Sequence, residues 1–175
     1  MSELCFLLDT NCFIESSKTY YPFCYAPAFW DALIYGHRME MIYTLSEVKK
    51  EILEKGDEIR DWIEQANVPA TFVQNMTDAG IQNYADMQKW VSRHPHFSPS
   101  EKSEFAEKRT DGYLVAHAKA TNMVVVTQEK LIIDPNTTKI KIPNLCQQFG
   151  VKYTNLFDML KQLNVRFILE TAKKA

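Results

Sequence analysis

Several features that would place this chain in a special class of protein are scarce or missing. The sequence has only 5 glycines, and 24% charged residues stand against 46% hydrophobic ones, a composition unlike that of disordered or low-complexity chains. No apolar run reaches the roughly 18 residues of a membrane span, and no basic segment precedes the apolar residues 4–8. We therefore expect a single globular domain over residues 1–170 with no membrane segment, followed by a disordered tail at residues 171–175.

Paired cysteines and an excess of charge are also lacking. Cys5, Cys12, Cys24 and Cys146 form no CxxC pair, which argues against a zinc site and is typical of reduced thiols in the cytoplasm. The formal net charge of −2 gives no overall attraction to nucleic acid, so such binding would need a local basic face. We predict a cytoplasmic protein with free thiols.

Strand-like and helix-like segments alternate along the chain. Short apolar runs predict strands at residues 3–8, 39–44, 68–73 and 123–127. Helical spacing of apolar residues predicts helices at 28–35, 48–63 (one helix, or two broken near Gly56), 81–91 and 110–120. Thr44 with Glu47 has the pattern of a capping box, and Thr110 that of an N-cap. The alternation predicts a parallel α/β fold, whose ligands gather at the carboxyl ends of the strands.

Four acidic residues are predicted to meet at that edge. Asp9 and Glu129 follow the two most convincing strands, so both project from the same side of a parallel sheet. Asp111 lies in the first turn of the 110–120 helix, on its apolar stripe. Glu51 borders the apolar stripe of the helix that contains it, and Glu47, further round that helix, is the second choice.

Such a group of carboxylates has a definite chemistry. Converging carboxylates raise one another's pKa unless a cation neutralises them, and hard oxygen ligands select Mg²⁺ or Mn²⁺. Ions of this kind activate water and stabilise the charge that develops on a phosphodiester. The four acids therefore predict metal-dependent hydrolysis of a phosphate ester.

Neighbouring residues are predicted to support this chemistry. Thr127, at the end of its strand, can donate a hydrogen bond that orients Asp9. Arg109 and Lys49 flank the acids and are candidates for contacts with phosphates, although a solvated face is an equally ordinary reading of such charges. Asp134 is the alternative to Glu129 as fourth acid.

Three segments carry a family resemblance. Residues 6–11 read FLLDTN, residues 46–52 read SEVKKEI, and residues 111–118 read DGYLVAHA, followed by VVVT at 124–127. They resemble, in order, the opening hydrophobic-Asp-x-Asn motif, the helical second motif, and the third acid with its helix and Thr-ended strand of PIN domains. The resemblance is closest to the small, single-domain, VapC-like bacterial toxin type, although many PIN domains have Asp where this chain has Glu129.

The resemblance implies more than the residues show by themselves. It implies a PIN-like three-layer α/β/α sandwich with a central, mainly parallel sheet, in which Asn11 supports the metal ligand Asp9. It also implies an Mg²⁺- or Mn²⁺-dependent endoribonuclease, with RNA as substrate, that forms a homodimer and is neutralised by an antitoxin encoded beside it.

Two other functions and two side issues stay open. A phosphatase of the haloacid-dehalogenase type needs a second Asp where this chain has Asn11, so we rank it low. A PIN-fold module that only binds RNA or protein would tolerate loss of any acid. Five aromatic residues are candidates for the core, a dimer interface or base stacking: Tyr20, Tyr21, Phe23, Phe29 and Trp30. His94 and His96 favour a solvated loop over a metal site.

Overall fold

The computed structural model describes residues 4–55, 58–65 and 67–168. The predicted tail at 171–175 and the Gly56 position of the predicted helix break lie outside the described residues.

A five-stranded sheet forms the centre of the molecule. Its strands are β1 (Phe6–Leu8), β2 (Ile42–Leu45), β3 (Val73–Gln74), β4 (Val124–Val126) and β5 (Tyr153–Thr154). Their order is β3-β2-β1-β4-β5, and every neighbouring pair is parallel. Strand β1 lies between β2 and β4, with Leu8 opposite Thr44 on one side and Val126 on the other. The central strands therefore end at one common edge.

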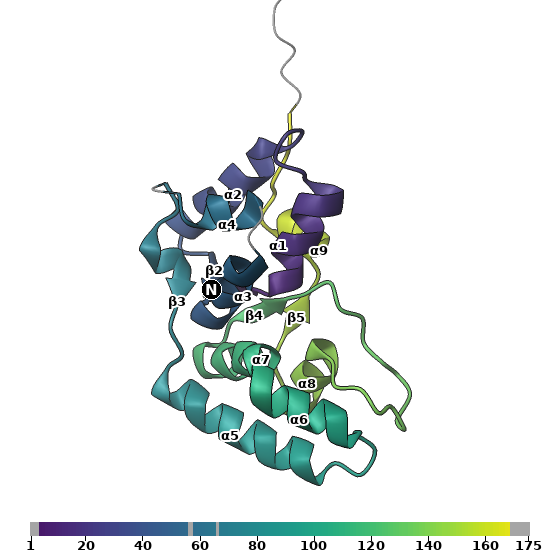
Figure 1. The fold of residues 1–175 in the computed structure, drawn as a ribbon. Helices are drawn as coiled ribbons and strands as arrows, with labels where there is room; N and C mark the ends of the chain where they lie inside the picture. The colour runs from purple at the N-terminus through teal and green to yellow at the C-terminus, as the bar shows by residue number, and fades with distance from the viewer. Residues whose placement is uncertain (1–3, 56–57, 66, 169–175) are drawn as a thin grey trace, which may run out of the picture.

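Helices cover both faces of this sheet. They are α1 (Thr10–Glu15), α2 (Pro27–Arg38), α3 (Ser46–Lys55), α4 (Glu58–Ile63), α5 (Asp78–Arg93), α6 (Pro99–Lys108), α7 (Thr110–Thr121), α8 (Ile142–Phe149) and α9 (Leu156–Gln162). A π-helical turn, Ser16–Tyr20, continues α1, and a 3₁₀ turn, Ala70–Phe72, precedes β3. Helices α1, α2, α4 and α9 lie on one side of the sheet and α5 to α8 on the other (Figure 1). The predicted three-layer α/β/α sandwich with a parallel sheet is confirmed.

Burial explains why the two central strands were the easiest to predict. All three residues of β1 and all three of β4 are buried, as expected for strands that are covered by helices on both faces. Leu7 and Leu8 are fully buried, and each such side chain contributes about 1.5–3 kcal/mol relative to exposure. This rigid core fixes the residues that follow each strand.

Three local predictions need correction. Thr44 is a strand residue of β2, not a helix cap, and its hydroxyl donates to the Leu8 carbonyl across the sheet. Within residues 68–73, only Val73 belongs to a strand, because Pro69 precedes a 3₁₀ turn. Thr110 is the first residue of α7, and the N-cap is Arg109, which has the left-handed φ of 57°.

Most of the aromatic residues belong to the core. Phe29 and Trp30 are buried, Tyr21 stacks on Phe29, and Phe23 stacks on Trp30. The core reading is therefore confirmed for this cluster, while Tyr20 is 42% exposed. Within the described ranges, no helix has both the length and the apolar character that crossing a bilayer requires.

Candidate active site

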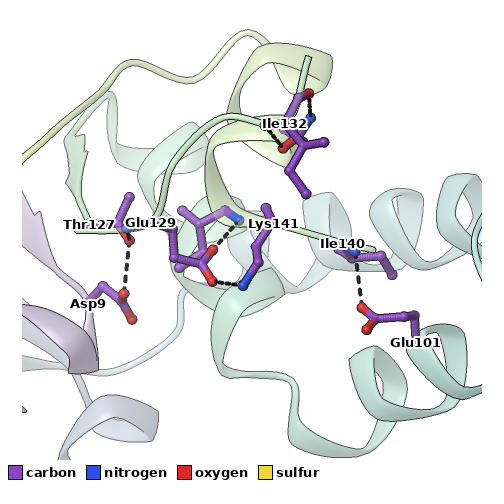
Figure 2. Close-up of polar contacts among 9 residues, drawn as sticks. Asp9, Glu101, Thr127, Glu129, Ile132, Ile140 and Lys141 are labelled. Carbon is purple, nitrogen blue, oxygen red and sulfur yellow. Dashed lines mark hydrogen bonds and ion pairs between the residues drawn. The ribbon is translucent and has the colours of Figure 1, made fainter. Parts of the chain in front are cut away.

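Asp9 lies at the centre of the sheet edge. It follows β1 directly and is the N-cap of α1, and its backbone NH donates to the Val126 carbonyl of β4. The side chain is only 2% exposed. The Thr127 hydroxyl donates a hydrogen bond of 3.0 Å to Asp9 Oδ2, so the predicted bond between these two residues is present (Figure 2). This bond fixes the orientation of a buried carboxyl group.

Burial makes ionisation of Asp9 unfavourable. Loss of water, followed by repulsion from Asp111 and, more weakly, from Glu129, raises its pKa from 3.8 to about 8, against the lowering effect of the Thr127 hydrogen bond. A carboxyl group in such surroundings is either protonated or accompanied by a cation.

Asp111 is the second carboxyl group of this kind. It lies in the first turn of α7 and is partly buried. Its pKa is raised from 3.8 to about 7, first by burial and then by repulsion from Glu129 and Glu51, whereas Lys141 lowers it. The structure therefore brings the four predicted acids close enough for their charges to shift the pKa values of Asp9 and Asp111.

The residue next to Asp111 explains its fixed position. A Cβ atom on Gly112 would lie 2.5 Å from the Tyr84 ring and 2.7 Å from the Phe105 ring. Only glycine allows α7 to approach α5 and α6 this closely. The close packing fixes Asp111 at the sheet edge.

Glu51 reaches the site from α3. The Thr10 hydroxyl donates to Glu51 Oε2 at 2.5 Å, which ties the helix to the residue after Asp9. Glu47 instead accepts from Ser46 and lies 3.5 Å from Lys50. Glu47 lines a neighbouring hollow but not the cleft that Glu51 shares with Asp111 and Glu129. Glu51, the first choice on α3, is thus the residue that lines the cleft with Asp111 and Glu129.

Both oxygens of Glu129 already have partners. Oε1 lies 2.5 Å from Lys141 Nζ, and Oε2 accepts from the backbone NH of Ile142, the first residue of α8, at 2.8 Å. Figure 2 shows this carboxylate directed toward Lys141, while Thr127 is directed toward Asp9. The hydrogen bond with Glu129 raises the pKa of Lys141.

Lys141 is a site residue that sequence reasoning missed. It lies in the segment between β4 and α8, which has no periodic pattern. The one available signal is its place directly before Ile142 and Pro143, because proline early in a helix marks a helix start.

Asp134, the alternative fourth acid, is not brought to the site. It is exposed, its Oδ1 accepts from the backbone NH of Asn136, and it borders a separate hollow beside His94. The ring of His94 stacks on Phe97. Asp134 therefore shapes a turn and has no contact with the acids.

Three of the four predicted acids, Glu51, Asp111 and Glu129, line a cleft of about 330 Å³, whereas the buried Asp9 does not line it. Its wall also contains Lys108, Arg109, Lys139 and Lys141, and a more open hollow that shares Glu51, Lys108 and Arg109 adjoins it. The predicted phosphate-binding residue Arg109 is thus beside the acids, whereas Lys49 lines neither hollow.

The donor set fits a divalent cation with few protein ligands. Among the side chains that the structure describes, no three His, Cys, Asp or Glu lie close enough to hold one ion as they stand. Glu129 has a partner on both oxygens, while Thr10 engages one oxygen of Glu51 and Thr127 one oxygen of Asp9. The two carboxyl groups with strongly raised pKa values, Asp9 and Asp111, are the first candidates for ligands. Mg²⁺ is usually held by one or two carboxylates and completes its shell with water. A cation between these two carboxyl groups would offset the loss of water and the repulsion that raise their pKa values.

The sequence matches one family of known domains. Residues 6–167 match the family described as "Domain of unknown function (DUF4411)". No curated protein matches the chain in sequence.

Solved structures of toxin–antitoxin complexes are similar in fold. The FitAcB crystal structure from Neisseria gonorrhoeae superposes with a TM-score of 0.53 at 19% identity, covering 86% of this chain and 96% of that one. VapBC-1 from nontypeable Haemophilus influenzae has a TM-score of 0.53 at 12% identity and covers 87% and 98%. FitAB bound to a DNA fragment has a TM-score of 0.51 at 19% identity, with 86% and 94% coverage. The chain therefore has the fold of PIN-domain toxins and belongs to the family described as a domain of unknown function, DUF4411.

Proposed function

We propose that this protein is an endoribonuclease that hydrolyses RNA phosphodiester bonds with Mg²⁺ or Mn²⁺ bound at Asp9 and Asp111. The observation that carries the proposal is the pair of carboxyl groups, at the carboxyl edge of the sheet, whose pKa values burial and mutual repulsion raise to about 8 and about 7. Keeping two such carboxyl groups close together and shielded from water costs stability unless a cation accompanies them.

Each residue has a distinct role in this proposal. Asp9 and Asp111 hold the cation, and the Thr127 hydroxyl keeps Asp9 in the ligating orientation. Glu51 lines the same cleft and either ligates directly or orients a water. A divalent cation in such a site lowers the pKa of bound water and stabilises charge on the phosphate. Asn11, two residues after Asp9 in α1, remains a predicted support for Asp9.

Basic residues of the cleft wall support binding of a nucleic-acid strand. Its volume of about 330 Å³ lies at the small end of ligand pockets, which span about 300–1,000 Å³. Arg109 and Lys108 lie where the cleft meets the neighbouring hollow, so they are available to phosphates on one side of the acids. Phosphate contacts of this kind position a strand without reading its sequence.

We further propose that the protein is the cytoplasmic toxin of a type II toxin–antitoxin pair. Support comes from the fold, because the similar solved structures are the complexes FitAB and VapBC-1. An antitoxin partner and a homodimer belong to this proposal.

One observation favours a second candidate, a catalytically inactive PIN-fold module that binds RNA or protein. Lys141 and the Ile142 NH occupy both oxygens of Glu129, and Thr10 occupies one oxygen of Glu51. A module without catalysis would keep these bonds permanently.

A cleavage assay separates the two candidates. Purified protein is incubated with total RNA in EDTA, Mg²⁺ or Mn²⁺, alongside Asp9→Asn and the control Asp134→Asn, which changes an exposed acid outside the cleft. The nuclease proposal predicts cleavage only with a divalent ion, its loss in Asp9→Asn and its retention in Asp134→Asn. RNA that stays intact with every ion while still binding the protein would support the inactive module.

A further inference from the structure

The ion pair between Lys141 and Glu129 places a lysine ammonium inside the acidic cleft. Lys141 is the N-cap residue of α8, and its side chain turns back to Glu129 Oε1 at 2.5 Å. The two side chains are 36% and 14% exposed. A surface ion pair of this kind contributes little to stability in general, yet this one lies among the residues that we assign to cation binding.

Two other cations of the cleft wall, Lys108 and Arg109, have their hydrogen-bond partners on α6. Lys108 pairs with Glu104 one turn before it on α6, and Arg109 Nε donates to the Ala106 carbonyl at the end of the same helix. Only Lys141 contacts one of the four predicted acids directly, within the part of the chain that the structure describes. Its charge also lowers the pKa of Asp111.

Support of helix α8 does not account for Lys141. Glu129 Oε2 accepts from the Ile142 NH by itself, which satisfies a free amide at the start of α8. Asn144 additionally ties α8 to Ile132 through two hydrogen bonds of 3.1 and 2.8 Å. The Lys141 carbonyl accepts from the Leu145 NH, as any N-cap residue does, but the lysine side chain adds no hydrogen bond to the helix, so its placement calls for another role.

We propose that Lys141 provides the second positive charge of the cleft, so that one divalent cation binds on the Asp9 and Asp111 side while the ammonium contacts a phosphate oxygen of the RNA. This inference rests on the proposed function, and it makes Glu129 the residue that positions Lys141 instead of a metal ligand. In this role the Lys141 ammonium takes the place of the second ion of a two-metal site.

The chemistry of the ammonium group matches this assignment. Two-metal sites use ions about 3.5–4 Å apart to neutralise the attacking and the leaving oxygens. An ion bound at Glu129 Oε1 would have to displace Lys141 from its 2.5 Å contact. Lysine carries one positive charge and three N–H donors, so it can keep Glu129 and donate to a phosphate oxygen at the same time. No proton leaves the ammonium in this role.

Counting bound Mn²⁺ ions tests the inference without an activity assay. Mn²⁺ is titrated into metal-free protein and followed by electron paramagnetic resonance and by calorimetry, for the natural chain, Lys141→Met, Lys141→Arg and Lys130→Met. Lys130 is an exposed lysine in the same segment and does not line the cleft, so it controls for loss of one charge.

We expect one ion per chain in the natural protein, Lys141→Arg and Lys130→Met. In Lys141→Met, Glu129 loses its cation, and we expect a second, weaker ion. Two ions in the natural protein, or a single ion in Lys141→Met, would overturn the inference while leaving the nuclease proposal standing. If neither the natural chain nor any variant bound an ion, both the inference and the nuclease proposal would be overturned. If Lys141→Met fails to fold, two ions in the natural chain would still overturn the inference, and Lys141→Arg, which keeps the charge, must still bind one.

Kinetics provide an independent check on the phosphate contact. Removing one donor to developing charge costs about 10²–10³ in kcat, so Lys141→Met should lower kcat about 10²-fold with a smaller change in KM. Lys141→Arg should recover part of the rate, because it restores the charge. A Lys141→Met protein with unchanged kcat, and with an unfolding temperature equal to that of the natural chain, would contradict the contact.

Discussion

Asp9→Asn should make the metal-free protein more stable at neutral pH while abolishing its activity. Folding raises the pKa of Asp9 from 3.8 to about 8, so at pH 7 the folded protein holds a proton that the unfolded chain has released. At pH 7, roughly three pH units above the ordinary value, this proton uptake costs up to ~4 kcal/mol at 1.36 kcal/mol per unit. Asparagine has nearly the same volume and no charge, and its amide oxygen can still accept from Thr127.

The sign of the effect follows from the direction of the pKa shift. A group whose folded pKa is raised favours folding below its unfolded pKa and loses that contribution as the pH rises through the folded pKa. Between pH 4 and pH 8 the natural chain should therefore lose stability that the variant keeps. We expect the free energies of unfolding of the two proteins to be about equal near pH 4, and that of the variant to be higher by about 2–4 kcal/mol at pH 7.5.

Urea unfolding in EDTA, followed by tryptophan fluorescence, measures this difference. Trp30 and Trp62 are buried and report on the core. Asp134→Asn is the matched control, because the same change at an exposed acid outside the cleft should leave stability within about 0.5 kcal/mol. A difference between Asp9→Asn and the natural chain that does not grow with pH would refute the reasoning.

Three further predictions concern neighbouring parts of the site. Mg²⁺ should raise the unfolding temperature at pH 8 but scarcely at pH 5, where protons occupy Asp9 and Asp111; equal gains at both pH values in differential scanning fluorimetry would contradict this. Thr127→Val removes the hydrogen bond that lowers the pKa of Asp9, so the acidic limb of the pH–rate profile should move to higher pH, and an unmoved limb would count against the role of Thr127. Gly112→Ala should destabilise by about 1–3 kcal/mol in urea unfolding, because its Cβ would lie 2.5 Å from the Tyr84 ring; unchanged stability would show that α7 shifts freely.

The parts of the site that lie on regular elements were predictable from the sequence. Asp9 follows a strand that is buried on both faces, and Asp111 lies in the first turn of a helix that is largely buried. Parallel strands bring such positions to one edge whatever their separation along the chain. Thr127 was found by the same argument, and it directly follows β4.

The parts that depend on irregular segments were not predictable. Lys141 follows a stretch without strand or helix, and no periodicity shows that it returns to Glu129. Strand β5 has two residues and helix α9 seven, too few for a reliable pattern of apolar residues. Thr44 has the sequence of a helix cap, yet pairing with β1 makes it a strand residue because tertiary contacts outweigh local preference.

Cleavage of a fluorescently labelled oligoribonucleotide by Asp111→Asn and the natural chain, across a Mn²⁺ titration at pH 7.5, tests the central claim most directly. The account predicts that the natural protein cuts only when the ion is present. It also predicts that Asp111→Asn, folded and with the same content of secondary structure, cuts at least about 10²-fold more slowly at every Mn²⁺ concentration. Cleavage by the natural protein in EDTA, or an Asp111→Asn protein as active as the natural chain, would contradict it.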